Sequence, residues 1–185
     1  GQFEDPDAKH RPHPFWSWND RLDPDELRRQ VREMKETGLG GFFMHARDGL
    51  LTDYLGDEWF DCVRASADEA EKNGLRAWCY DEDGWPSGSA GRKIPREHEE
   101  YRWSWVRMID AESEKKDGVG KTIGRFAVAA DNSYRRLGDG EEAADGEREY
   151  RAAVFSGDDY TDILNPEAVR AFLDETHERY LAETG

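Results

Sequence analysis

A short apolar run, Leu75-Arg76-Ala77-Trp78-Cys79, leads directly into acids and turn-forming residues, Tyr80-Asp81-Glu82-Asp83-Gly84-Trp85-Pro86-Ser87-Gly88. The apolar run has the length of a buried strand, so the three carboxylates lie where that strand ends. Gly, Pro and Ser then predict a turn around one large aromatic ring, Trp85. Carboxylates held at a strand mouth can have their pKa values pushed apart, as acid/base catalysis needs, and a flat Trp face suits a sugar ring. The alternative is a solvated loop on an acidic protein.

The residues before this strand predict a repeated strand–helix pattern. Strands are predicted at 14–19, 41–45 and 75–80 because these runs are apolar and short. A first helix is predicted to begin with Asp23 as N-cap and Pro24 at its first position, and to stop at Gly38. A second helix is predicted from about Asp57 to Gly74. Alternation of this kind with short connections predicts right-handed βαβ units and a parallel sheet.

The pattern changes after residue 95. Three strand-like runs separated by charged, Gly-rich turns predict a small antiparallel β insertion, at Arg102–Ile109, Ile123–Ala129 and Tyr150–Phe155. Trp103 and Trp105 alternate along the first of these runs, and we interpret them as packing residues rather than ligand contacts. The strand–helix pattern resumes at residues 160–164, and Asn165 and Pro166 predict the start of a last helix.

The predicted fold class is α/β: a partial (β/α)8 TIM-type barrel of about four βα units with the antiparallel insertion. Residues 1–95 form the first units, residues 96–158 the insertion, and residues 159–185 a fourth unit. A complete barrel needs ~250 residues, so the 185 residues correspond to part of a longer enzyme. The chain alone is not expected to be active, and the open barrel edge predicts self-association or pairing with the other barrel half.

Polar residues follow each predicted barrel strand, at Asn19, His45 to Asp48, Asp81 to Asp83, and Asp162 to Asn165. The carboxyl ends of parallel strands lie on one face, and that face holds the active site. Four polar clusters on one face favour a functional site. The alternative is that such residues cap helices, as Asn165 is expected to do.

Four runs of the sequence resemble a known family of enzymes. The runs Pro14–Asn19, Gly40–Arg47, Tyr80–Gly88 and Thr161–Pro166 are similar to the amino-terminal barrel half of glycoside hydrolases related to the α-L-rhamnosidases of glycoside hydrolase family 106. The resemblance implies a (β/α)8 catalytic domain acting on oligosaccharides or glycosides of plant or microbial origin. It also suggests a calcium ion, without identifying ligands in this chain.

Glycoside hydrolysis needs two carboxyl groups, one protonated and one ionised. The predicted catalytic residues are Glu82 and Asp81, with Asp162 a weaker candidate. Glu82 is the favoured chemical group because it is expected to begin the loop after the strand, with Asp81 in a positioning role. The predicted substrate-binding residues are Trp16, Trp18, Asn19, His45, Arg47, Asp83 and Trp85.

Composition excludes several other classes. The net charge is -16, from 42 acidic and 26 basic residues of which 19 are Arg, a balance that resembles proteins from salt-loving organisms. It argues against nucleic-acid binding and against docking on an anionic membrane. No apolar run is long enough to span a bilayer and no signal peptide is visible, which slightly favours a cytoplasmic location. Cys62 and Cys79 are expected to be small core residues.

Two rival functions are retained. The first is a carbohydrate-binding or interaction module that has the sugar platform without the chemistry. The second is a metal-dependent barrel hydrolase, which would place His-x-His at the first strand end, where this chain has Trp16-Ser17-Trp18-Asn19. That difference ranks the metal-dependent hydrolase low.

Overall fold

The computed structural model describes residues 4–111 and 120–185, and these divide into two compact units. The first unit combines Gly1–Ile94 with Ile163–Gly185, and the insertion unit is Pro95–Asp162. The architecture is mixed α/β with two separate sheets. Among the described helices, none combines the length and the apolar character needed to cross a bilayer.

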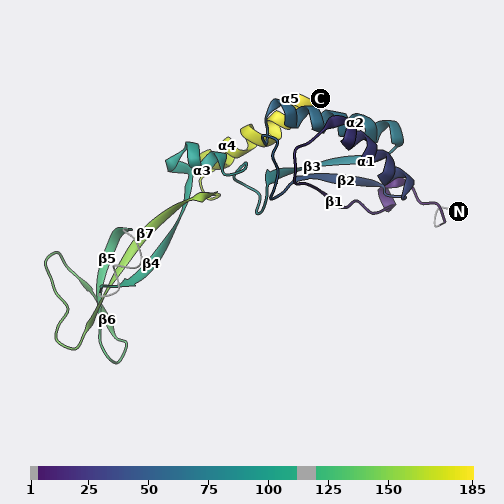
Figure 1. Ribbon diagram of the computed structural model, residues 1–185. Helices are drawn as coiled ribbons and strands as arrows, with labels where there is room; N and C mark the ends of the chain where they lie inside the picture. Colours follow the sequence, from purple (N-terminus) through teal and green to yellow (C-terminus); the bar gives the residue numbers. More distant parts are fainter. Residues whose placement is uncertain (1–3, 112–119) are drawn as a thin grey trace. The chain divides into compact units, whose positions relative to one another are not determined.

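A three-stranded parallel sheet forms the centre of the first unit (Figure 1). Its strands are β1 (Phe15–Trp18), β2 (Gly41–Ala46) and β3 (Arg76–Asp83), in the order β1-β2-β3. Parallel pairing of the runs at 41–45 and 75–80 confirms the predicted βαβ connections. The register places Phe15, Phe43 and Trp78 in one row across the sheet.

The helices of the first unit begin and end where local chemistry predicts. Helix α1 (Pro24–Glu36) begins after Asp23, whose Oδ1 accepts a hydrogen bond from the Glu26 amide at 2.8 Å. Helix α2 (Asp57–Asn73) ends at Gly74, which has a left-handed φ of 66° that suits glycine. A short 3-10 turn, η1 (Ala8–His10), precedes β1.

One face of the parallel sheet packs against α1 and α2 (Figure 1). Trp18, Phe42 and Met44 point into this layer and are almost completely buried. Trp59 and Phe60 of α2 are also buried, and the Trp18 and Trp59 ring centroids lie 5.0 Å apart. Apolar burial at roughly 25 cal/mol per Å² makes this layer the main source of stability in the unit.

The opposite face of the sheet carries aromatic side chains that reach solvent. Phe15 is 57% exposed and Trp78 is 43% exposed. The run from Leu75 was expected to be a buried strand, and this expectation is wrong for β3, in which Arg76 and Cys79 are also exposed. In the described residues only three parallel strands are present, so β3 has a neighbour on one side only.

The chain returns to the first unit through a continuous helical segment. It comprises α4 (Pro166–Leu173), a π-helical turn labelled η4 (Asp174–Glu178) and α5 (Arg179–Thr184). Asn165 caps α4 as predicted, with Oδ1 accepting from the Glu167 amide at 3.0 Å. The segment is held to α2 by the Trp59 Nε1 donor, which lies 3.1 Å from the Tyr180 hydroxyl.

The insertion unit contains an antiparallel sheet with strand order β4-β7-β5-β6. The strands are β4 (Arg102–Asp110), β5 (Lys121–Val128), β6 (Tyr134–Leu137) and β7 (Arg148–Thr161). A short helix, α3 (Lys93–Glu97), and a 3-10 turn, η2 (Glu99–Tyr101), lie before β4.

Two details of the insertion differ from the sequence prediction. Strand β6 was not predicted, because its residues are charged and few. Strand β7 continues to Thr161, so the first two residues of the run predicted as a fourth barrel strand, residues 160–164, belong to the antiparallel sheet, and residues 162–164 form no strand. The coarse α/β class with a β insertion therefore stands, whereas a four-stranded part-barrel is not found in the described residues.

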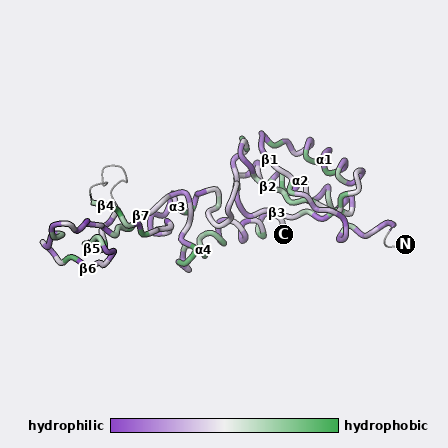
Figure 2. The backbone as a smooth tube through the Cα atoms, turned by 90° about the horizontal axis from the view of Figure 1, so that it is seen from below, coloured by the Kyte–Doolittle hydropathy of each residue, from purple (hydrophilic) through white to green (hydrophobic). Residues whose placement is uncertain are grey.

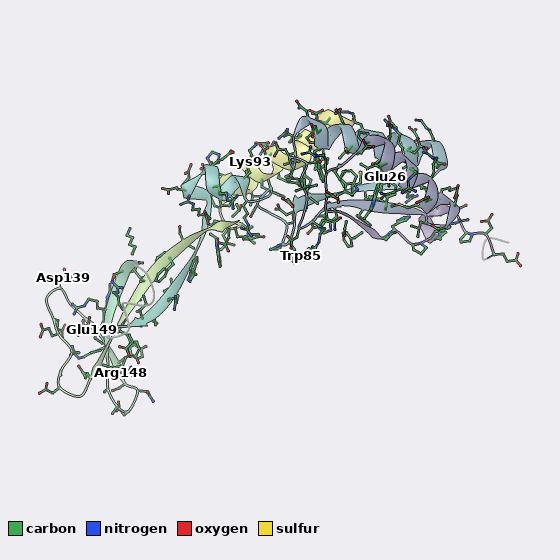
Figure 3. The ribbon with its side chains drawn as sticks, viewed as in Figure 1. Glu26, Trp85, Lys93, Asp139, Arg148 and Glu149 are labelled. Atoms are coloured by element: carbon green, nitrogen blue, oxygen red, sulfur yellow. The ribbon has the colours of Figure 1, made fainter. Side chains whose placement is uncertain are left out.

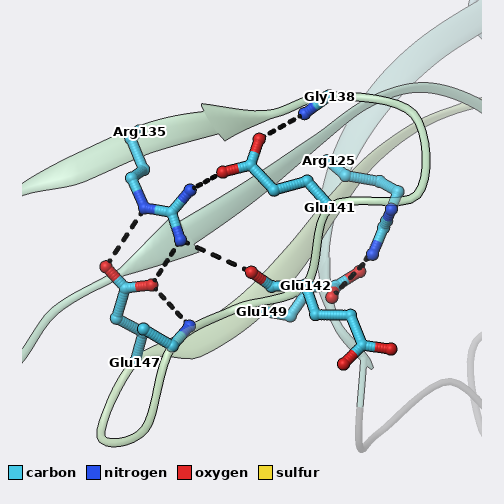
Figure 4. Close-up of polar contacts among 8 residues, drawn as sticks. Arg125, Arg135, Gly138, Glu141, Glu142, Glu147 and Glu149 are labelled. Atoms are coloured by element: carbon cyan, nitrogen blue, oxygen red, sulfur yellow. Dashed lines mark hydrogen bonds and ion pairs between the residues drawn. The ribbon is translucent and has the colours of Figure 1, made fainter.

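Ion pairs tie the strands of the insertion together (Figure 4). Arg125 makes two contacts with the Glu149 carboxylate, at 2.8 and 2.9 Å. Arg135 bonds Glu141 and Glu147, and the Glu141 carboxylate also accepts from the Gly138 amide at 2.9 Å. Figure 2 shows the hydrophilic character of much of this unit. Exposed pairs contribute little each, so they fix register more than they add stability.

Candidate functional site

The loop after β3 is organised around one buried carboxylate, that of Glu82. The side chain is 2% exposed. Its two oxygens accept hydrogen bonds from five backbone amides, those of Asp83 at 3.0 Å, Gly88 at 3.0 Å, Ser89 at 2.7 Å, Ala90 at 2.9 Å and Gly91. Such convergence folds the loop back on its own strand end.

The same loop contains backbone conformations that side chains disfavour. Ala90 and Arg92 have φ values of 51° and 67°, in the left-handed region. Non-glycine residues remain in that region only when their surroundings hold them there. Here the Ala90 and Gly91 amides donate hydrogen bonds to the Glu82 carboxylate, and these bonds stabilise the unusual backbone conformation of the loop. Burial raises the pKa of the Glu82 carboxyl above its ordinary value, and the amide donors offset part of this rise.

Asp83 lies beside a second carboxylate at the strand ends. Ala46 pairs with Asp83 in the sheet register, which brings the end of β2 and its following residues close to the end of β3. The residue reaches solvent, yet its surroundings desolvate the carboxyl enough to raise its pKa, and the charge of Asp48 adds to the rise. His45 and Arg92 act in the opposite direction. Neighbouring carboxyls of this kind can divide the acid and base roles.

Aromatic rings pack against one another at the ends of β2 and β3. His45 is 5% exposed, and its ring centroid lies 4.2 Å from that of Tyr80. The His45 Nε2 atom lies 3.2 Å from the Gly84 carbonyl oxygen. Trp85 stacks on Tyr80 with centroids 5.9 Å apart and planes 8° from parallel. Trp85 is 73% exposed and lies on the side of the sheet away from α1 and α2 (Figure 3).

Asp81 points instead towards the carboxyl-terminal helical segment. Its Oδ1 accepts a hydrogen bond from the Ser87 hydroxyl at 2.7 Å, and its Oδ2 lies 3.5 Å from Nε2 of His177. His177 belongs to the π-helical turn, and its Nδ1 is 3.0 Å from the Thr176 hydroxyl. Asp81 thereby connects the loop to the last helix.

The side chains of Trp16 and Trp18 lie on the helix-covered side of the sheet, where Trp16 is half-buried and Trp18 is buried. Trp18 is 1% exposed and packs edge-on against Trp16 and Trp59. Trp16 donates from Nε1 to the side-chain oxygen of Gln30 in α1 at 3.0 Å. The reason is the alternation of a strand, which sends residues 16 and 18 to the face opposite Phe15.

The remaining predicted residues fall into two groups. Asn19 and Arg47 are exposed next to the strand ends, and the Arg47 amide donates to the Trp18 carbonyl at 3.0 Å. Asp162 belongs to the insertion unit, where its amide donates to the Tyr101 carbonyl at 2.8 Å. Within the first unit, the His45 charge acts on Asp83, and Tyr80 packs against both His45 and Trp85.

A calcium site is not supported by the side chains. Within residues 4–111 and 120–185, no group of three or more His, Cys, Asp or Glu residues is arranged to hold a metal ion. We therefore assign no catalytic step to a metal.

Three residues of this region were not among the predicted site residues. Asp48 could have been predicted from the sequence, because it belongs to the polar run that follows β2. Tyr80 also had a signal, because it alternates with Trp78 along β3. His177 had none, because its approach to Asp81 depends on the π-helical turn.

Comparison with solved structures gives a distant likeness. No protein-family model and no curated protein matches the chain. A solved rhamnosidase from Novosphingobium sp. PP1Y is 20% identical over the match, which has a TM-score of 0.44. The match covers 66% of this chain and 12% of that chain, so the present sequence corresponds to a small part of that structure's length. A likeness this distant does not decide the fold or the activity.

Proposed function

We propose that the first unit is the saccharide-binding part of a glycoside hydrolase of the α-L-rhamnosidase type. The observation that carries the proposal is the exposed Trp85 ring, which stacks parallel on Tyr80 in the loop directly after Asp83. Sugars are bound by flat aromatic faces together with polar groups that fix their orientation. The motif from Tyr80 to Gly88, which resembles glycoside hydrolases related to family 106, supports the same conclusion.

Within this proposal, Asp83 is the favoured general acid. A general acid must be protonated near the working pH, and burial together with Asp48 raises the Asp83 pKa in that direction. It would protonate the glycosidic oxygen as the bond to the anomeric carbon breaks. Asp48, or a carboxylate outside the described residues, would act as the base or nucleophile.

Glu82 and Asp81 take supporting roles in this proposal. All five donors to Glu82 are backbone amides of its own loop, so its carboxylate serves to shape the loop. Asp81 is engaged by Ser87 and His177. Asp162 stays a weaker candidate for a catalytic carboxylate, and it belongs to the insertion unit rather than the first unit.

Binding is tested by calorimetric titration of the full chain with methyl α-L-rhamnopyranoside. Trp85→Ala is expected to weaken binding about tenfold or more, since aromatic contacts contribute up to roughly 1.5 kcal/mol beyond area. Trp16→Phe is the matched control, because Trp16 lies on the helix side. Equal affinity of the Trp85→Ala variant and the unaltered chain would contradict the proposed platform.

The second candidate is a binding module without chemistry. It is favoured because the Glu82 carboxylate already accepts hydrogen bonds from five backbone amides, which leaves fewer carboxylates able to reach a ligand. Hydrolysis of p-nitrophenyl α-L-rhamnopyranoside distinguishes the two candidates. If hydrolysis occurs, Asp83→Asn should lower kcat by ~100-fold or more. Binding without hydrolysis in a longer chain that contains all barrel strands would establish the binding module.

A further inference from the structure

Tyr54 lies between β2 and α2 in the first unit, with its side chain half-buried and its hydroxyl oxygen enclosed. The ring packs edge-on against Trp59 of α2, with centroids 4.9 Å apart. Leu55, the next residue, has a left-handed φ of 62°, and its carbonyl accepts a hydrogen bond from Arg179 at 2.5 Å. A leucine keeps such a conformation only when its surroundings hold it there. The place of the Tyr54 ring is therefore fixed by the packing around it.

Gly91 brings the Tyr54 ring close to the Asp83 side chain. A Cβ atom at Gly91 would lie 3.3 Å from Cδ1 of Tyr54, 3.4 Å from Cβ of Asp83 and 3.8 Å from Oδ2 of Asp83. The Tyr54 ring edge and the Asp83 side chain therefore both reach the small space beside the Gly91 Cα atom. Gly91 also has a φ of 67°, so glycine suits both the backbone angle and the close approach.

One oxygen of Glu82 holds the two backbone segments together. Its Oε1 atom accepts hydrogen bonds from the Asp83 amide at 3.0 Å and from the Gly91 amide. Glu82 is buried, so both bonds form away from water, where an amide without an acceptor would be costly. This shared acceptor fixes Gly91 beside Asp83, and with it the approach of Tyr54 to the same side chain.

The surroundings of Asp83 therefore differ from one side to the other. Tyr54 and Gly91 place carbon atoms on one side, yet the residue as a whole remains exposed. Excluding water from one side disfavours the charged carboxylate, which agrees with burial being the largest cause of the raised Asp83 pKa. Among charged groups, Asp48 raises the Asp83 pKa, whereas His45 and Arg92 lower it. Such a carboxyl can keep its proton and still reach a ligand.

We propose that Tyr54 is a positioning residue for Asp83: its ring, together with Gly91, forms a wall that excludes water from one side of the carboxyl. In this role Tyr54 neither touches a ligand nor transfers a proton. It keeps one side of the carboxyl dry and leaves the other side open. The wall matters for catalysis only if Asp83 is the general acid of the proposed function, but its effect on the Asp83 proton needs no turnover.

Carbon-13 NMR of the side-chain carboxyls in the full chain tests the wall through the titration midpoint of Asp83. Tyr54→Ala opens the wall to water, so the midpoint should fall towards the ordinary value of 3.8. Tyr54→Phe retains the ring and should keep the midpoint of the unaltered chain. Phe60→Leu is the matched control for lost packing, because Phe60 is a buried aromatic residue of α2. It should lower the free energy of unfolding without moving the midpoint.

Tyr54→Leu guards against loss of folding, because leucine retains part of the apolar bulk. Its midpoint should lie between those of Tyr54→Ala and the unaltered chain. The role of Tyr54 is overturned if the folded variants that lack the ring leave the midpoint unchanged. It is also overturned if Tyr54→Phe lowers the midpoint as much as Tyr54→Ala does, since the effect would then belong to the hydroxyl.

Hydrolysis of p-nitrophenyl α-L-rhamnopyranoside separates this role from the proposed function. A lowered midpoint in Tyr54→Ala without any hydrolysis by the unaltered chain supports the wall and counts against the hydrolase alone. Where hydrolysis occurs, the upper limb of the pH–rate profile should move to lower pH in Tyr54→Ala and stay in place in Tyr54→Phe. An unmoved limb together with an unmoved midpoint would overturn the role of Tyr54 and leave Asp83 as the general acid.

Discussion

The Nε2 atom of His177 lies 3.5 Å from Oδ2 of Asp81, so the last helical segment contacts the strand end that carries the acidic motif. The contact depends on the π-helical turn at Asp174–Glu178. Turns of this kind are rare and often occur at functional sites, because they reposition one side chain within a helix. In this chain the turn places the His177 imidazole at Asp81.

We expect Asp81→Ala to remove the contacts with both of its partners, Ser87 and His177, at unequal cost in stability. The Ser87 hydrogen bond is short, whereas the His177 contact is longer and partly exposed. Double-mutant cycles with Ser87→Ala and with His177→Ala should therefore give about 1 kcal/mol and at most ~0.5 kcal/mol, respectively. Urea unfolding measures both values.

Salt provides the control for this pair. The His177 side chain is about half exposed, so its coupling to Asp81 should shrink in about 1 M salt. The Ser87 coupling should change little with salt. A His177 coupling that is insensitive to salt would show that the contact is not an ion pair.

Glu82→Gln should destabilise the protein much more than Asp81→Asn. The amide end of Gln has donors where five backbone amides need acceptors, so several buried N–H groups lose their partner. We expect a loss of at least about 2 kcal/mol in the free energy of unfolding. Increased protease cleavage between residues 83 and 92 would identify the loop as the region affected. If stability is unchanged, the carboxylate does not organise the loop.

Asp48→Asn should lower the pKa of Asp83. Burial is the largest cause of the raised Asp83 pKa, and the Asp48 charge is the second. A raised pKa in the folded protein means that stability falls as pH rises from the ordinary value of 3.8 through the folded value. The substitution should reduce this fall and stabilise the protein slightly at neutral pH.

Carbon-13 NMR of the side-chain carboxyls measures the Asp83 titration directly. Arg92→Ala is a control of opposite sign, because Arg92 lowers the Asp83 pKa. A midpoint that does not change in either variant would show that Asp48 and Arg92 are too distant to matter. The role of Asp83 as general acid would then rest on burial alone.

Much of the first unit could be predicted because its signals are local. Asp23 and Asn165 cap the helices that they were expected to cap, and Gly74 ends α2 in a left-handed conformation. The parallel pairing of β2 and β3 followed from the helix between them. These features depend on neighbouring residues, which a sequence records.

Other features depend on residues distant in sequence. Glu82 was expected at the start of a loop, but β3 continues to Asp83, and the carboxylate is buried by amides up to nine residues later. The end of β7 was mistaken for a barrel strand because Tyr160 and Thr161 have the same local composition in either sheet. Trp16 and Trp18 alternate with Phe15 and Ser17 along β1, and this alternation places their side chains on the helix side of the sheet.

Glu175 should stabilise the protein at neutral pH and not at low pH. Its carboxylate lies 2.5 Å from Lys93 and 2.7 Å from Arg179, and Arg179 also donates to the Leu55 carbonyl at 2.5 Å. Burial acts to raise the Glu175 pKa, but the bonds from Lys93 and Arg179 together lower it. A lowered folded pKa contributes stability above the unfolded value of 4.5, and this contribution is lost as pH falls through the folded value.

Glu175→Gln should therefore cost about 1 kcal/mol near pH 7 and almost nothing near pH 2. Thermal melts across this range measure the difference from the unaltered chain. Glu178→Gln is the matched control. Glu178 lies on the same π-helical turn, but its contact with Arg170 is longer, at 3.5 Å, and both side chains are exposed. If both variants lose the same stability at every pH, the helical segment is not held to the Lys93 region by charge, and its attachment rests on the packing of Tyr180 against Phe60.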